Sequence, residues 1–210
     1  IGLQRYEEAE AAFKKGMAVS NSPLDFLENL MYLAKLQHQD SKLVGYLKQI
    51  LKLDNQHPEA LKEMGLYIYH QKNYSLALQF LDRYLIVRPD DGKILFLLGN
   101  CLFQENKFEQ ALKCYQDAYE NHFRDTVLYY HMGLVYLNLK KYLNAYEELY
   151  KVKRRIPNDD EVNLKLAVAA AQIGKVAEAE QIFERLLQKN PQKSLLYYNL
   201  GLMYFRNNKI

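Results

Sequence analysis

The chain has 210 residues, of which 49% are hydrophobic and 25% are charged, as in an ordinary globular protein. Lys and Arg exceed Asp and Glu by only 28 − 25 = 3, which argues against nucleic acid or an anionic membrane surface as a partner. No stretch approaches the roughly 18 uninterrupted apolar residues of a membrane-spanning helix, so we expect no membrane association of this segment.

Small residues and prolines recur along the chain with a period of thirty-four positions. Gly65, Gly99 and Gly133 follow one another at this period, and Gly201 stands two periods after Gly133. Four alanines repeat at the same period, namely Ala77, Ala111, Ala145 and Ala179. Three prolines keep the same register, namely Pro89, Pro157 and Pro191. Three independent series in one register predict an internally repeated structure.

Each unit is predicted to be a pair of helices. In 92–125, apolar residues follow the spacing of one helical face over 95–102 and again, after a polar break, over 108–118. Clusters of Pro and Asp separate the units and supply helix N-caps. In chain order we predict a second helix at 1–23, helix pairs at 24–57, 58–91, 92–125, 126–159 and 160–193, and a first helix at 194–210. In the pair at 24–57, Met31 and Leu43 occupy the two small positions, so we expect its helices to lie farther apart.

These residues resemble the tetratricopeptide repeat. Its motif is matched in 92–125 by Leu95, Leu98, Gly99, Leu102, Ala111, Tyr115 and Ala118, and the neighbouring units carry it too. The resemblance covers the whole chain and implies an all-α fold, a right-handed superhelical solenoid of antiparallel helix pairs that usually binds proteins. It makes 1–23 and 194–210 halves of truncated repeats. Because neither end has an evident polar cap, we expect the native array to continue in both directions.

Catalytic and cofactor-binding motifs are absent from the sequence. No phosphate-binding loop, His-Glu-x-x-His or Cys-x-x-Cys occurs, and the five histidines lack metal-ligand spacing. The pairs Asp90/Asp91 and Asp159/Asp160 are interpreted as N-caps in solvated turns rather than as acid–base catalysts. We therefore predict no catalytic residues, no metal, no cofactor and no small-molecule substrate.

Cys101 and Cys114 are predicted to be free thiols, because they stand at different heights on the two helices of one unit. Two cysteines make no disulfide framework and require no oxidising compartment. The compartment stays open, with the cytoplasm favoured.

A basic run, defined by Lys151, Lys153, Arg154 and Arg155, ends the second helix of its unit. Cations there complement the helix dipole, by about 0.3–1 kcal/mol each. We favour this structural role over a patch for phosphate or an acidic partner.

The resemblance also implies a concave face, lined by the first helix of each unit. Carried over position by position, that face is apolar and aromatic between residues 92 and 138. Phe96, Phe103 and Tyr130 are expected to anchor a partner there, and polar neighbours are expected to orient it. The predicted partner-binding residues are Tyr69, Phe96, Asn100, Phe103, Tyr130, His131, Leu134 and Asn138. The alternative is that the leucines of this face only pack helix against helix.

The sequence thus predicts a non-catalytic scaffold that binds a protein partner, as a peptide or helix, in a concave groove. Two alternatives stay open. One is self-assembly into homo-oligomers, with copies stacked end to end or inserted into each other's groove. The other is that the array is the substrate-targeting region of a larger enzyme.

Overall fold

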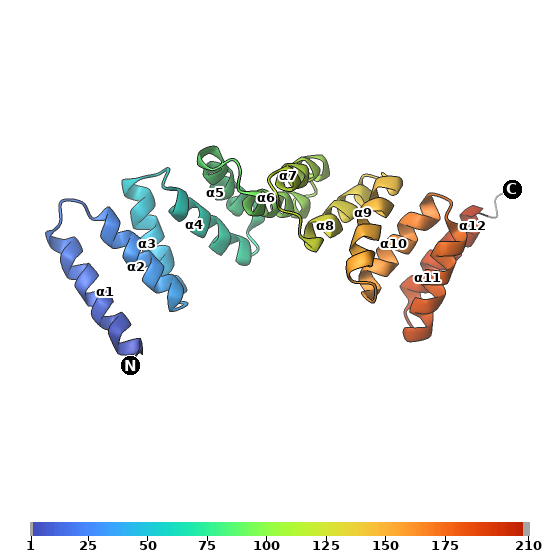
Figure 1. Ribbon diagram of the computed structural model, residues 1–210, viewed down its shortest axis with the longest axis horizontal. Coiled ribbons are helices and arrows are strands. Elements are labelled where there is room, and N and C mark those ends of the chain that lie inside the picture. The colour runs from blue at the N-terminus through green and yellow to red at the C-terminus, as the bar shows by residue number, and fades with distance from the viewer. Residues whose placement is uncertain (1, 208–210) are drawn as a thin grey trace. The chain divides into compact units, whose positions relative to one another are not determined.

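The computed structural model describes residues 2–207, with side chains from residue 5, and in that range the chain forms twelve α-helices and no strand (Figure 1). The prediction of an all-α fold is confirmed. The helices are α1 (Gly2–Val19), α2 (Leu24–Leu36), α3 (Asp40–Leu53), α4 (Pro58–His70), α5 (Tyr74–Val87), α6 (Gly92–Gln104), α7 (Phe108–Glu120), α8 (Thr126–Asn138), α9 (Tyr142–Arg155), α10 (Asp160–Gln172), α11 (Val176–Lys189) and α12 (Ser194–Asn207). Residues 1 and 208–210, which the predicted flanking half repeats include, lie outside the described residues.

The helix starts repeat the sequence period. The even-numbered helices begin at residues 24, 58, 92, 126, 160 and 194, and α3, α5, α7, α9 and α11 begin at 40, 74, 108, 142 and 176. Every step in both series equals the sequence period of thirty-four positions. The assignment of these helices to five complete and two half repeats remains our interpretation of the sequence.

By its internal contacts the chain divides into two compact units, residues 1–90 and residues 91–210. In the first unit α2 packs on α3 and α4 packs on α5. In the second unit the packed pairs are α6 with α7, α8 with α9 and α10 with α11, and α12 packs on α11. Neighbours in the sequence are therefore neighbours in each unit, as in a solenoid.

The periodic glycines stand at points where the second helix of the pair packs tightly against the first. A Cβ atom at Gly65, Gly99 or Gly133 would stand closer than 3.0 Å to a side chain of the second helix of the pair. The side chains concerned are Leu81, Tyr115 and Leu149. The expectation that a small residue lets the two helices come together is confirmed at all three positions.

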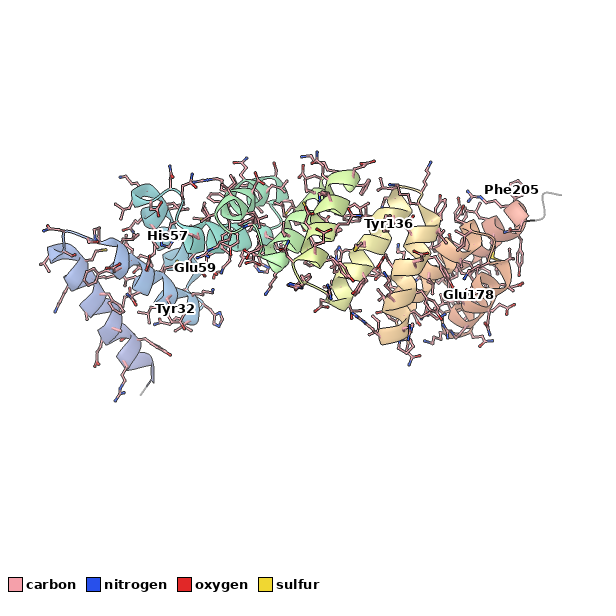
Figure 2. The ribbon with its side chains drawn as sticks, turned by 45° about the horizontal axis from the view of Figure 1, so that its top comes forward. Tyr32, His57, Glu59, Tyr136, Glu178 and Phe205 are labelled. Atoms are coloured by element: carbon pink, nitrogen blue, oxygen red, sulfur yellow. The ribbon has the colours of Figure 1, made fainter. Side chains whose placement is uncertain are left out.

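Turn residues cap the helices α4, α6, α8 and α10, at two of them through the predicted Asp clusters, whereas α2 has no side-chain cap. Asp91 Oδ1 accepts a hydrogen bond from the backbone N–H of Ile94 (3.1 Å), and Asp159 Oδ1 accepts two at the start of α10. At α4 the cap is His57, labelled in Figure 2, whose Nδ1 accepts from the backbone N–H of Ala60 at 3.2 Å. Its Nε2 lies 2.6 Å from Glu28 Oε1. These side chains satisfy helix N–H groups that would otherwise lack partners.

Candidate functional site

Helices α6, α7 and α8 of the second unit bring four aromatic rings together around the ring of His131. The ring centroid of His131 lies 5.3 Å from that of Phe96, 5.9 Å from Tyr115, 5.9 Å from Tyr130 and 6.3 Å from Phe103. All four contacts are edge-on, the arrangement that aromatic quadrupoles favour. We call these five residues the aromatic cluster.

The inner side of the aromatic cluster is a buried polar network. The hydroxyl of Tyr115, which is fully buried beside Gly99, donates a hydrogen bond to Asn100 Oδ1 at 2.8 Å. The same hydroxyl lies 3.4 Å from His131 Nδ1. Burial lowers the pKa of His131, because the apolar surroundings disfavour the charged imidazolium. His131 therefore belongs to the cluster as a neutral ring.

Two of the predicted partner-binding residues lie in the core instead. Phe96 is only 7% exposed and Asn100 only 6%. The Phe96 ring stacks on Phe123 with 5.0 Å between centroids, and the Asn100 amide is held by Tyr115. The expectation that Phe96 offers its ring to a partner and that Asn100 orients that partner is corrected, since both side chains are already occupied within the unit.

The other predicted residues of this region remain accessible. Phe103, Tyr130, His131 and Leu134 are half-buried and Asn138 is exposed. Tyr130 and His131 stand about one helical turn before Leu134, and Asn138 stands one turn after it, donating a hydrogen bond to the Leu134 carbonyl at 2.9 Å. We call these five residues the α6–α8 face.

Tyr130 also lines a pocket that sequence reasoning missed. This pocket of about 330 Å³ lies where the N-termini of α8 and α10 meet the C-terminus of α9. Its walls are mostly apolar, with contributions from Val127 and Ile156, and Glu161 stands at its edge. The Tyr130 hydroxyl donates to Glu161 Oε1 at 2.8 Å; burial, together with this carboxylate, raises the pKa of Tyr130. The only sequence signal was an apolar Ile156 beside Pro157, in a turn that is otherwise polar. We call it the α8–α10 pocket.

Tyr69, the remaining predicted residue, belongs to the first unit. It lies on α4, is half-buried, and packs edge-on against the ring of Tyr74 with 5.7 Å between centroids.

Two family models match the chain. The model described as "Tetratricopeptide repeat" matches residues 136–200, and the model described as "Anaphase-promoting complex, cyclosome, subunit 3" matches residues 70–152. The chain is a tetratricopeptide repeat protein. Proteins with this repeat generally mediate protein–protein interaction and are typically not enzymes.

Curated relatives of this tetratricopeptide repeat protein are distant. A TPR repeat-containing protein of Methanocaldococcus jannaschii is 24% identical over 196 residues, covering 89% of this chain and 34% of the relative. The BBSome complex member BBS4 of Mus musculus is 25% identical over 211 residues, covering 98% of this chain and 40% of the relative. The chain thus spans well under half the length of these relatives.

Solved structures share the fold. YrrB, described as a TPR protein with an unusual peptide-binding site, superimposes with a TM-score of 0.68 at 18% identity, over 78% of this chain and 84% of that one. MamA superimposes with a TM-score of 0.68 at 19% identity, over 81% of this chain and 93% of that one. These likenesses establish the helical solenoid of this tetratricopeptide repeat protein.

The basic run of this tetratricopeptide repeat protein is largely engaged within the second unit. Lys151 pairs with Glu148 at 2.8 Å, and Lys153 lies 3.8 Å from Glu178, which Figure 2 labels. The Arg155 guanidinium donates to Thr126 Oγ1 at 3.2 Å and lies 4.8 Å from the Tyr129 ring centroid. Three of the four cations of the run are therefore held by side chains of the second unit.

Within residues 2–207 of this tetratricopeptide repeat protein, no group of three or more His, Cys, Asp or Glu residues is placed to hold a metal ion. None of the helices described is both long enough and apolar enough to cross a membrane. Cys101 is buried and Cys114 half-buried, and among the described residues neither forms a disulfide. Burial raises the pKa of the Cys101 thiol to about 12, since a thiolate would lose its hydration there.

Proposed function

We propose that this chain is a non-catalytic scaffold that binds a peptide or helical segment of a protein partner on the second unit. The segment lies along the α6–α8 face, and one apolar side chain of the partner enters the α8–α10 pocket. Tyr130 links the two, because it belongs to the face and lines the pocket.

The α8–α10 pocket is the observation that carries this proposal. Its volume of about 330 Å³ is sufficient for a large side chain, and its lining is mainly apolar. Val127 and Ile156 are 38% and 42% exposed, so apolar surface is already open to solvent at its mouth. Burying such surface beside a fixed aromatic ring is the usual source of binding energy in a protein interface.

The polar groups of the region support binding rather than catalysis. The Tyr115 hydroxyl is held by Asn100, and the Tyr130 hydroxyl is held by Glu161. Burial raises the Tyr130 pKa and lowers the His131 pKa, so near pH 7 both groups are neutral. Hydroxyls that are already hydrogen-bonded, beside an uncharged imidazole, position a surface rather than activate a nucleophile.

The descriptions of two similar proteins also support the binding of a peptide or protein partner. YrrB has a peptide-binding site according to its description, and BBS4 is described as a member of a protein complex. Binding of a peptide or a protein partner by this chain would fit the behaviour of both.

The experiment is a selection of peptides from a random phage-displayed library on the full chain, followed by affinity measurements. Tyr130→Ala should weaken binding of the selected peptides about thirtyfold, since truncating a central aromatic anchor costs about 2 kcal/mol. Ile156→Ser should weaken it about tenfold by making the pocket wall polar. Circular dichroism should show unchanged helicity in both variants.

Leu143→Ser is the matched control, because Leu143 is 58% exposed on α9 and does not line the pocket. It should leave the affinity unchanged. Selected peptides that bind the Tyr130 and Ile156 variants as tightly as the unmodified chain would refute the proposal, as would a selection that returns no binders.

A further inference from the structure

A second apolar surface lies in the first unit, on another set of helices. A trough of about 650 Å³ runs between α3 and α5, with α4 beneath it. Leu51 and Phe80 form its half-buried sides, and Met64 and Ile68 of α4 form its floor. We call it the α3–α5 trough.

One residue of the apolar wall that α5 contributes, Leu76, has no apolar counterpart at the same position of α3, α7, α9 or α11. Leu76, at 37% exposure, and Phe80 lie on the α3–α5 trough. The residues one period later in the sequence, on α7, are Gln110 and Cys114, and those two periods later, on α9, are Asn144 and Glu148. The position of Leu76 is polar at Lys42 and Glu178 as well, whereas that of Phe80 is again apolar at Ile182, so the fold itself does not require a leucine at position 76. An exposed apolar surface that the fold does not require marks an interaction site.

The rim of the α3–α5 trough is cationic. Lys48, Lys52 and Arg83 line it, and its described lining includes no carboxylate. The Arg83 guanidinium donates to the Asn55 carbonyl and lies 6.0 Å from the Phe80 ring centroid, which holds it beside the trough. The ion pairs described in the first unit involve Lys14, Lys35, Lys42, His57 and Lys62. Lys48 and Lys52 are in none of them, so their charges are available to an anionic partner.

The spacing of these residues suits a helical partner. Lys48 and Lys52 stand one helical turn apart on α3, and Leu76 and Phe80 stand one turn apart on α5. Each turn of an α-helix rises about 5.4 Å, so side chains spaced one turn apart on a partner helix match this spacing. Such a helix in the trough can place apolar side chains against α5 and carboxylates against α3. We propose that the α3–α5 trough binds an acidic amphipathic helix of a protein partner. This site does not depend on the α6–α8 face or the α8–α10 pocket.

The probe is a synthetic helical peptide of five turns with leucines along one face and glutamates beside them. Its binding to the full chain is followed by fluorescence anisotropy in 50 mM salt. Replacing the glutamates by glutamines should weaken binding about tenfold, and replacing them by lysines should abolish it. Raising the salt to 300 mM should weaken the glutamate peptide several-fold, because exposed ion pairs are screened.

Two variants test the two halves of the trough. Lys48→Glu with Lys52→Glu should weaken the glutamate peptide at least tenfold and should remove its advantage over the glutamine peptide. Leu76→Gln installs the residue that the chain itself carries at position 110, and should weaken both peptides about fivefold. The control is Lys93→Glu with Arg185→Glu, the same change in net charge at exposed positions of the second unit, and should leave binding unchanged.

The proposal is overturned if the glutamate peptide does not bind at 1 mM, if the three peptides bind equally, or if the control pair weakens binding as much as the trough pair. Vesicles made of two parts phosphatidylcholine and one part phosphatidylserine are a competing probe. Tighter binding to these vesicles than to the peptide, lost in the Lys48 and Lys52 variant, would assign the surface to an anionic membrane and overturn the proposal. Variants at Tyr130 and Ile156 should leave the glutamate peptide unaffected, which separates this test from that of the proposed function.

Discussion

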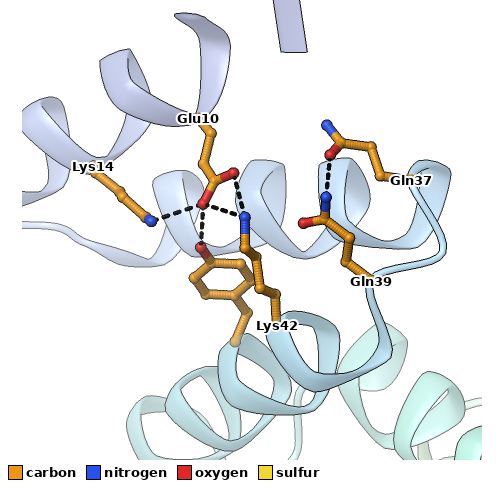
Figure 3. A network of polar contacts seen from close by, with 6 residues as sticks. Glu10, Lys14, Gln37, Gln39 and Lys42 are labelled. Atoms are coloured by element: carbon orange, nitrogen blue, oxygen red, sulfur yellow. Dashed lines mark hydrogen bonds and ion pairs between the residues drawn. The ribbon is translucent and has the colours of Figure 1, made fainter. Parts of the chain in front are cut away.

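Glu10 of α1 is the centre of an ion-pair network in the first unit (Figure 3). Its carboxylate lies 2.7 Å from Lys14 Nζ and 2.8 Å from Lys42 Nζ, so it joins α1 to α3. Hydrogen bonds from Lys14 and then Lys42 lower the pKa of Glu10 from 4.5 to about 2. Because the folded-state pKa lies below the unfolded value, the network contributes its full stability above about pH 4.5. That contribution is lost as the pH falls from 4.5 towards 2.

Glu10→Gln should therefore lower the free energy of unfolding at pH 7 by about 1 kcal/mol, a modest value because both lysines are half-exposed and screened. The difference from the unmodified chain should shrink to nothing near pH 2. Urea unfolding followed by circular dichroism between pH 7 and pH 2 measures this. Glu7→Gln, at an exposed position of the same helix, is the control and should change little. A Glu10 variant whose stability falls with pH in parallel with the unmodified chain would contradict the interpretation.

At the scale of the elements, the turn inside each helix pair has a single recurring geometry. One residue per turn has a positive φ, and these residues recur at the sequence period: His38, Lys72, Asn106, Lys140 and Gly174. The following residue donates a backbone hydrogen bond back into the helix, for example Lys141 N–H to the Tyr136 carbonyl at 2.9 Å. This left-handed helix C-terminus costs a residue with a Cβ about 1–2 kcal/mol and glycine almost nothing. Only Gly174 avoids that cost.

Lys140→Gly should therefore raise the free energy of unfolding by about 1 kcal/mol, and Gly174→Ala should lower it by about the same amount. Gly45→Ala is the control, because it shows what replacing a glycine by alanine does to stability where the backbone is helical and unstrained. Gly45 lies inside α3 with nothing within 4 Å of an added Cβ, so alanine there should stabilise the helix by up to about 1 kcal/mol. Thermal unfolding of the three variants shows whether each substitution raises or lowers the stability. A Gly174→Ala variant that is more stable than the unmodified chain would show that the turn is not strained.

At the scale of the whole molecule, the close approaches of paired helices are local to each compact unit. Gly99 faces the fully buried ring of Tyr115, which cannot move aside within a packed core. Gly201, in the same register on α12, has nothing within 4 Å of an added Cβ among the described residues. Since neighbouring helices carry most of the packing, damage at one pair should remain in its own unit.

Gly99→Ala should lower the stability of the second unit by about 1–3 kcal/mol through overpacking. Amide hydrogen exchange should rise throughout residues 91–207 and stay unchanged in residues 2–90. Gly201→Ala is the control, and should leave exchange unchanged or slow it in α12, because alanine favours the helix. Equal acceleration over both units by Gly99→Ala would show that the chain unfolds as one cooperative block instead.

The sequence by itself determined the helical architecture. Gly99 and its counterparts recur because each packs against the next helix in the chain. The residues that determine this packing lie close together in the sequence, so a sequence pattern can reveal it. The caps at Asp91 and Asp159 could be predicted for the same reason, because a capping side chain bonds to a backbone N–H only two or three residues away.

Only the tertiary structure decided which side chains of the candidate site reach solvent. Phe96 and Asn100 occupy positions that a repeat usually exposes, yet Phe123 and Tyr115 cover them. The α8–α10 pocket likewise depends on how three helix ends meet, as at Tyr130 and Ile156. Periodicity assigns a residue to a face of its helix. Its exposure is set by the size of neighbours that come from other helices, and no local pattern contains that information.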